Sequence, residues 1–474
     1  MNATRDKTSP GEVRLLAVTS ILGYGFPESA LEIGMQADPH MIGADAGSTD
    51  PGPYYLGAGV PFCSRLSIKR DTRLMLLAAV PRGIPVVIST CGGAGGEPHL
   101  QFMAELVREI AREEKLDFKL ALIHAEQDKG FIKQQLAAGK VKPASRRPAL
   151  TVEQVDGAER IVALMGPEPF ERALENGAQV ILAGRATDPS IWAAGVARGG
   201  LPPEMGWYAG KMLECGAEPA APKRDGCLLA RVYQDYIDLE PTNPEQSCTR
   251  LSVANFALHE NPSAIHHYEP GGMLDTSACS FEQLTDRIVR VRGMKWVPAD
   301  VYTVKMEGVQ RMGYRAISML ATRDPVLIKG IDDYLLRVRA IVDEKSRNFG
   351  VPEGGYKLSI RSYGLNGVMG EREPRTTTTA HELSFILEVL APTQEVANAV
   401  IAIARTTTLH ADFPGRMCKE GNMGIPFSPA DVELGASYEF TVYHIVDAED
   451  PYHLFPIEYL DVTQGATAEV KGQP

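Results

Sequence analysis

The sequence predicts an α/β protein with a parallel-sheet N-terminal domain, a mixed α+β middle region and a small C-terminal α+β module. In the first half, short apolar runs alternate with amphipathic segments, as in sheets built from βαβ units. The middle contains strands of alternating polarity around one strong helix, and the tail reads as strand, helix and strand. At roughly 150 residues per domain, we place the predicted domains at 1–222, 223–375 and 376–474.

Five apolar runs predict the strands of the first domain, at 13–18, 39–43, 84–89, 118–124 and 178–183. Between them, residues 97–115 place Leu100, Met103, Val107 and Ile110 at helical spacing, with charged residues on the opposite face. This segment is therefore predicted to be a helix with one buried stripe.

The later elements follow from the same periodicities. In the middle region we expect strands at 285–292 and 301–305 and a helix at 324–345. In the tail we expect a strand at 381–390, a helix at 393–408 and a strand at 437–446. The Pro/Ala-rich stretch 216–224 and the stretch 370–379 are the expected boundaries.

Composition narrows the functional classes. The net charge is −12 and no Lys/Arg run is interleaved with aromatic residues, so nucleic-acid binding is not expected. No apolar segment is long enough for a secretion signal or a membrane span, so we expect no membrane association. Seven scattered cysteines without a CxxC pair indicate a reducing cytoplasm.

Three polar loops follow predicted strands, where ligands gather in parallel sheets. In the loop 43–55, Asp45 and Asp50 suit acid/base chemistry or Mg²⁺ binding, and Ser48 and Thr49 suit a carboxylate or phosphate. The alternative is a turn rich in Asp and Ser that caps the next element.

The second loop combines a cysteine with glycines and precedes the helix predicted at 97–115. Backbone N–H groups of Gly92, Gly93, Gly95 and Gly96, with the helix N-terminus, predict a site for an anion or a thioester phosphate, unless the loop is only a tight turn. Cys91 is either a nucleophile with a lowered thiol pKa or an inert small apolar residue.

The third loop contains Arg185, whose guanidinium offers a bidentate fork for a carboxylate. Thr187 and Asp188 either contribute to substrate binding or cap the helix that follows.

Further along, Glu269 lies in a Gly-rich turn and is a candidate catalytic acid or base. The neighbouring histidines lack metal-ligand spacing, so no metal site is assigned to them. Arg361 and Asn366 follow a strand and are expected to complete a polar pocket.

Six motifs together resemble the AtuA-like proteins, a family named after acyclic terpene utilisation. They occupy residues 90–96, 184–188, 210–216, 268–275, 323–325 and 421–429. The resemblance implies breakdown of branched acids and acyl-CoA thioesters, often with a small accessory protein. It transfers no catalytic residue.

The residues and the resemblance lead to one expected function. We expect a cytoplasmic lyase or hydratase that removes a proton next to the carbonyl of a small branched or hydroxy acid, or of its CoA thioester. Asp45, Asp50, Cys91 and Glu269 are the catalytic candidates, and a variant with Mg²⁺ on Asp45, Asp50 and Glu269 is kept open. The alternatives are acyl or CoA transfer through a covalent intermediate, and a non-catalytic acyl-CoA-binding subunit. A homo-oligomer is expected for a metabolic enzyme of this size.

Overall fold

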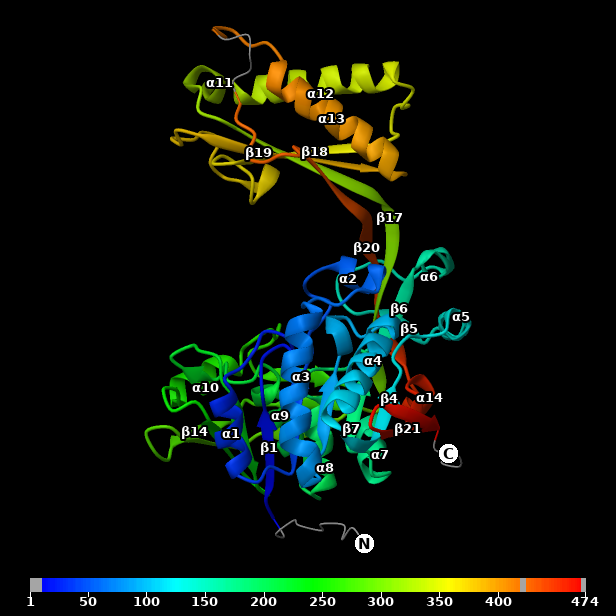
Figure 1. Ribbon diagram of the computed structural model, residues 1–474, viewed down its shortest axis with the longest axis vertical. Coiled ribbons are helices and arrows are strands. Elements are labelled where there is room, and N and C mark those ends of the chain that lie inside the picture. The colour runs from blue at the N-terminus through cyan, green and yellow to red at the C-terminus, as the bar shows by residue number, and fades with distance from the viewer. Residues whose placement is uncertain (1–10, 418–422, 470–474) are drawn as a thin grey trace. The chain divides into compact units, whose positions relative to one another are not determined.

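The computed structural model describes residues 11–417 and 423–469. Residue contacts divide the chain into two compact units (Figure 1). The first runs to Gln310 and resumes at Phe440, and the second is Arg311–Glu439. Each unit has its own apolar core.

The first unit is built on an eleven-stranded mixed sheet. Its five central strands are parallel, which confirms the predicted α/β class and the predicted parallel sheet. In spatial order they are β1 (Val13–Ala17), β2 (Met41–Asp45), β3 (Val86–Ser89), β7 (Val180–Ala183) and β4 (Asp117–Ile123).

Antiparallel strands extend this sheet at both edges, because later parts of the chain return to it. Beside β1 lie β9 (Leu228–Val232), β10 (Ile237–Pro241), β15 (Val289–Arg292) and β14 (Ser280–Gln283). Beside β4 lie β21 (Ile457–Thr463) and β22 (Ala466–Glu469).

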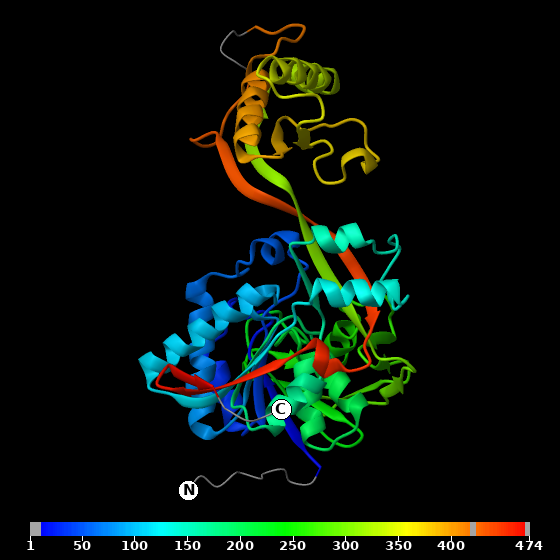
Figure 2. The same ribbon diagram turned by 90° about the vertical axis from the view of Figure 1, so that its right-hand side faces the viewer.

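Two helix layers cover the sheet, since its strands bury apolar side chains on both faces. Alternate residues of β1 illustrate this: Leu15 joins one core and Leu16 the other. Figure 2 shows the two helix layers on either side of the sheet. One layer is α1 (Glu28–Gln36), α3 (Arg65–Ala79) and α4 (Glu97–Glu114), and the other is α7 (Glu168–Glu175), α8 (Ser190–Arg198) and α9 (Pro203–Leu213).

Helix α4 forms where the sequence predicts it, with Leu100, Met103, Val107 and Ile110 buried. Pro98 lies in its first turn, and the helix ends at Glu114, followed by Lys115 with a left-handed φ of 54°. No helix in the described part of the chain is both long and apolar enough to cross a membrane.

The remaining elements of the first unit are shorter and surround the sheet. They are α2 (Pro53–Ala58), α5 (Lys129–Ala137), β5 (Val141–Pro143), α6 (Val152–Gly157), β6 (Arg160–Ala163), β8 (Ala220–Ala221), β11 (Ser247–Cys248), α10 (Arg250–Phe256), β12 (His266–Glu269), β13 (Gly272–Asp275), β16 (Lys295–Pro298) and α14 (Pro451–Leu454), with single 3₁₀ turns at Val80–Arg82 and Cys91–Gly93.

The chain enters the second unit within β17 (Thr303–Thr322) and leaves it within β20 (Asp431–Asp447). Between them come α11 (Pro325–Lys329), α12 (Ile331–Asn348), β18 (Lys357–Tyr363), a 3₁₀ turn at Gly370–Arg372, β19 (Leu383–Ala391) and α13 (Gln394–His410). The strand order β18-β19-β17-β20 with this β-α-β-β-α-β sequence is a ferredoxin-like arrangement.

Several predicted boundaries differ from the observed ones. The predicted helix at 324–345 is two helices, because the chain leaves helical geometry at Gly330. The predicted strand at 301–305 is the start of the 20-residue β17. The contact division has its limits at 310/311 and 439/440 and not at 222/223 and 375/376, because β9 and β10 continue the first sheet and α12 packs with α13 in one core.

Candidate functional site

A cavity of about 550 Å³ lies beyond the carboxyl ends of β2 and β7, within the size range of small-molecule sites. The loops after these strands contribute Ser48, Asp50, Arg185, Thr187 and Asp188 to its wall. Further lining residues come from α9, β12, β17, β20 and the segments next to them. They include Lys211, Glu214, His267, Glu269, Thr303, Lys305, Tyr443 and Ile445.

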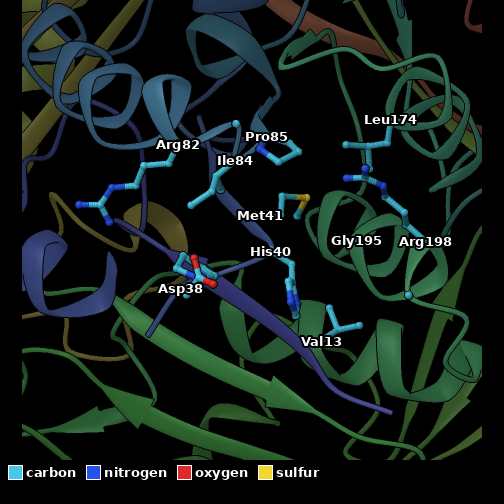
Figure 3. Close-up of a pocket in the computed structure, with 13 residues that line it drawn as sticks. Val13, Asp38, His40, Met41, Arg82, Ile84, Pro85, Leu174, Gly195 and Arg198 are labelled. Carbon is cyan, nitrogen blue, oxygen red and sulfur yellow. The ribbon is translucent and has the colours of Figure 1, made fainter. Parts of the chain in front are cut away.

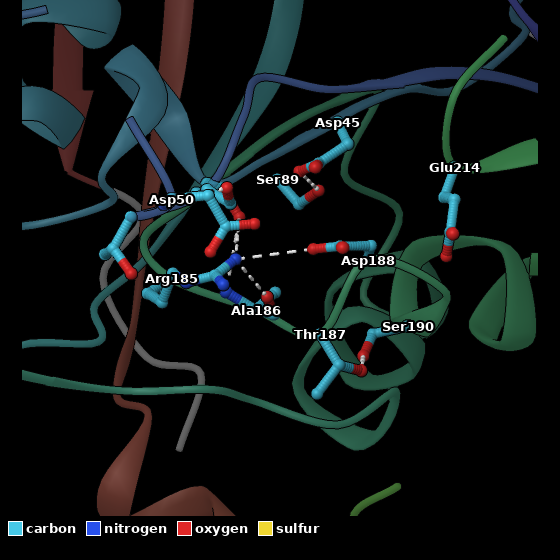
Figure 4. A network of polar contacts seen from close by, with 12 residues as sticks. Asp45, Asp50, Ser89, Arg185, Ala186, Thr187, Asp188, Ser190 and Glu214 are labelled. Carbon is cyan, nitrogen blue, oxygen red and sulfur yellow. Dashed lines mark hydrogen bonds and ion pairs between the residues drawn. The ribbon is translucent and has the colours of Figure 1, made fainter. Parts of the chain in front are cut away.

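Arg185 is the most buried cation of this wall, at 4% exposure. Its Nη1 contacts Asp188 Oδ1 at 3.3 Å and donates to the Ala186 carbonyl at 3.0 Å, and its Nε donates to Glu307 at 3.1 Å (Figure 4). Its Nη2 has no hydrogen-bond partner among the described residues. One edge of the guanidinium therefore remains available for a ligand.

Glu307, on β17, contacts the loop after β2, the loop after β7 and a neighbouring residue of its own strand. Its carboxylate accepts from Thr49 Oγ1 at 2.9 Å and from Arg185 Nε, and it pairs with Lys305 Nζ at 2.9 Å. Although burial opposes ionisation, Arg185 and Lys305 lower the pKa of Glu307 to about 2. Glu307 is thus a fixed anion that orients two cations of the cavity.

Lys211 and Glu214 form a second buried pair, one helical turn apart, with Nζ 2.6 Å from Oε1. Lys211 Nζ also donates to the His259 carbonyl at 2.7 Å. Burial, and to a smaller extent the charge of Asp188, keep the pKa of Glu214 well above its ordinary value despite Lys211.

Glu269 lies at the end of β12, half-buried in the cavity wall. Burial and the charge of Asp188 raise its pKa to about 8, while a hydrogen bond from Thr187 and the charges of Lys211 and Lys305 act in the opposite direction. An acid that titrates near neutral pH in a cavity is suited to proton transfer.

The structure separates the two aspartates of the loop after β2. Asp50 is exposed and lines the cavity. Asp45 is buried, does not line the cavity, and accepts from Ser89 Oγ at 2.9 Å (Figure 4). Burial, followed by the charge of Asp188, keeps its pKa well above the ordinary range, so the expected role of Asp45 as an ionised base is not supported.

Asp188 and Thr187 do not cap α8, which has no side-chain cap. Asp188 pairs with Arg185, and Thr187 Oγ1 lies 2.5 Å from Ser190 Oγ. Of the two alternatives for these residues, the structure favours a place in the cavity wall.

The Gly-rich loop after β3 does not form the predicted anion site. Gly92, Gly93, Gly95 and Gly96 are buried, and none of them lines the cavity. A Cβ on Gly95 would lie 2.3 Å from Arg185 N, and one on Gly93 would lie 2.8 Å from Phe62 Cβ. At the start of α4, the N–H of Glu97 donates to the Glu126 carboxylate at 2.9 Å, so a side chain already occupies this position. The glycines serve close packing.

Cys91 is fully buried, and its Sγ lies 3.8 Å from the Ile88 carbonyl. Burial raises the pKa of its thiol far above the ordinary value, which is opposite to the lowering expected at a helix N-terminus. The structure therefore favours an inert Cys91, and the expected nucleophile is not supported.

Two residues expected to complete the pocket belong to the second unit. Arg361 and Asn366 lie within Arg311–Glu439. Within residues 11–417 and 423–469, no three His, Cys, Asp or Glu side chains are grouped as metal ligands, so Asp45, Asp50 and Glu269 offer no preformed Mg²⁺ site. Two residues of the 421–429 motif, Gly421 and Asn422, lie outside the described residues.

Sequence reasoning did not select Lys211, Glu214, Lys305 or Glu307. The first two lie in the 210–216 motif, and the last two occupy alternate positions of one strand. For Lys305 and Glu307, the alternation of charged and apolar residues along the strand is the signal that could place both side chains on one face.

A smaller cavity of about 180 Å³ lies at the opposite, amino-terminal edge of the sheet. It is lined by Asp38, His40, Arg82 and Arg198 among others, and Figure 3 shows the guanidinium groups of Arg82 and Arg198 lying apart. His40 is engaged by Arg14, whose N–H donates to Nδ1 at 3.0 Å. This cavity contains none of the predicted site residues.

Comparison with known proteins gives one match. Residues 73–219 match the family model described as acyclic terpene utilisation family protein AtuA. This segment includes the Gly-rich loop, Arg185, Asp188, Lys211 and Glu214. No curated protein and no solved structure matches the chain.

Proposed function

We propose that this protein, whose residues 73–219 match the AtuA family model, is a lyase or hydratase. The reaction removes a proton next to the carbonyl of a small carboxylic acid or of its CoA thioester. One observation carries the proposal: Glu269, with a pKa of about 8, shares a cavity with the cations Arg185, Lys211 and Lys305. Acid/base groups tuned toward neutral pH beside anion-binding groups are typical of such chemistry.

Glu269 is the proposed general acid. Below about pH 8 it holds its proton, which it donates to the departing hydroxyl group in a dehydration. In the reverse hydration, the Glu269 carboxylate accepts a proton from the attacking water.

Asp188 is the proposed base. Its ion pair with Arg185 keeps a carboxylate on the cavity wall, and its charge is one cause of the raised pKa of Glu269. Two carboxyl groups of one site with different surroundings divide the roles of base and acid between them.

Arg185 is the proposed anchor for the negative charge of the substrate. Nε and Nη1 are engaged, whereas Nη2 has no partner among the described residues. Nη2 donates to the substrate carboxylate, or to the oxygen of an enolate that forms during proton removal. A donor fixed by Glu307 and Asp188 needs little reorganisation during the reaction.

Proton NMR in deuterated buffer tests the proposal. The purified protein is incubated with short hydroxy acids, unsaturated di-acids and their CoA thioesters, with and without a chelator. Deuterium next to the carbonyl or a new alkene signal is the expected result, and sensitivity to the chelator would reveal a required metal.

Silence across this panel from folded protein would contradict the proposal. Thioester exchange without deuterium incorporation would favour acyl or CoA transfer. Binding without turnover would favour a non-catalytic subunit that works with an accessory protein.

A further inference from the structure

Three basic side chains come from one short exposed segment that adjoins the cavity wall at Ala144. Lys142 belongs to β5, and Arg146 and Arg147 come directly after it, within a span of six residues. All three are exposed, and none forms an ion pair with a described residue. In a chain of net charge −12, we call Lys142, Arg146 and Arg147 the basic strip, a set of exposed cations without an ion-pair partner among the described residues.

Tyr443 connects the basic strip to the cavity. The Arg147 guanidinium lies 5.4 Å from the centre of the Tyr443 ring, and the Lys305 ammonium lies 4.9 Å from the same centre. Tyr443 and Lys305 both line the cavity, as does Ala144, which lies between Lys142 and Arg146 in the sequence. Tyr443 therefore contacts one cation of the strip, Arg147, and one cation of the cavity, Lys305.

The other charged residues at the exposed part of the cavity wall are acidic. Asp50 and Glu260 are exposed and come from different segments of the wall. They repel a phosphate group, whereas the strip attracts one. A ligand with one end in the cavity and phosphates outside it is therefore directed along the side of β5 and β20.

We propose that the basic strip binds the phosphate groups of a CoA thioester whose acyl end lies in the cavity. This inference rests on the proposed function and selects the thioester over the free acid as its substrate class. Charged and flexible side chains suffice for this role, because phosphates are held largely by charge attraction at a solvated surface.

Isothermal titration with CoA and with pantetheine, which lacks the phosphates, tests the proposal. The variant is Lys142→Ala with Arg146→Ala, and the control is Arg82→Ala with Arg198→Ala, which removes two exposed cations at the opposite edge of the sheet. Wild type should bind CoA more tightly than pantetheine. The strip variant should weaken CoA binding at least about fivefold, in proportion to two lost charge contacts, and the control should not. Added salt should reduce the difference.

Equal CoA affinity in the variant and wild type, equal affinity for CoA and pantetheine, or no CoA binding at all would overturn the proposal. Displacement of CoA by equimolar inorganic phosphate would also overturn it, since the strip would then be a general anion surface. Deuterium exchange into free acids is measured in parallel. Exchange without CoA binding removes only this inference, whereas no exchange into any acid or thioester removes the proposed function.

Discussion

Two loops at the same edge of the parallel sheet have opposite roles. The loop after β3, with its four glycines, is buried and closed by its own contacts. The loop after β7 lines the cavity with Arg185, Thr187 and Asp188. The carboxyl ends of the strands therefore indicate the edge of the sheet at which a cavity lies. They do not indicate which of the loops at that edge lines the cavity.

The two loops nevertheless pack closely and form hydrogen bonds with each other. Gly95 permits Arg185 to approach, because the Gly95 carbonyl accepts from Arg185 N at 3.0 Å and no Cβ fits there. Thr90, with a left-handed φ of 48°, presents its Oγ1 to Arg185 Nη1 and to the Ala186 N–H, each at 3.4 Å. The loop after β3 thus supports the loop that lines the cavity.

Glu269→Gln should give the largest effect on turnover, because it removes the proton donor and keeps the shape. We expect kcat to fall by about 10³-fold, within the usual range for a general acid. In wild type the rate should fall as the pH rises through about 8, where Glu269 loses its proton. Stopped assays between pH 5 and 9.5 on the substrate found by NMR measure both. An unchanged profile in the variant would contradict the assignment.

The same variant has a predicted effect on stability. Folded protein holds the Glu269 proton up to about pH 8, whereas the unfolded chain releases it near 4.5, so this group lowers stability as the pH rises between these values. Glu269→Gln cannot titrate and should lack this contribution. Urea unfolding at pH 5 and pH 8 should show the variant gaining on wild type at the higher pH.

Gly95→Ala should lower the stability of the protein by disturbing the packing of the loop after β3 against Arg185. Its φ is +67° and the new Cβ would lie 2.3 Å from Arg185 N, so we expect a loss of about 2–4 kcal/mol in unfolding free energy. Urea titration measures it, and Gly139→Ala, at φ +70° with open space around it, is the matched control for backbone strain alone. Equal losses in both variants would mean that the approach to Arg185 is unimportant.

Arg185→Lys should keep the charge beside Glu307 and lose the second donor edge. We expect kcat/KM to fall by about 10²-fold, as for removal of one preorganised donor. Thermal unfolding checks that the variant is folded. Full activity in a folded lysine variant would show that Nη2 does not bind the substrate.

Cys91→Ala should have the smallest effect. The thiol is buried and off the cavity wall, so we expect unchanged kcat and a stability loss of about 1 kcal/mol from a small cavity. Activity and urea unfolding are measured together. Loss of activity at wild-type stability would restore the covalent alternative.

The predictable parts of this molecule are those with local periodicity. The parallel strands and α4 follow from apolar runs and from a 3.6-residue stripe, and Arg185 follows from its place after a strand. Lys305 and Glu307 could not be placed, because only the folded chain brings β17 across to the loops after β2 and β7.

The roles of Asp45 and Cys91 escaped prediction for a related reason. Both residue types and their loops suit catalysis, but burial decides their protonation, and burial depends on packing by distant segments. Glu269 was selected from its Gly-rich turn, yet its pKa depends on Asp188, Lys211 and Lys305, which come from three other segments.

The proton-donor role of Glu269 can be tested directly without a substrate. Carbon-13 NMR of protein labelled at glutamate carboxyl groups, with Glu269→Gln to assign the signal, measures the pKa of Glu269 in the folded protein. We expect a midpoint of about 8. A midpoint near the ordinary value of about 4.3 would show that Glu269 is ionised at neutral pH, and would contradict its role as the proton donor.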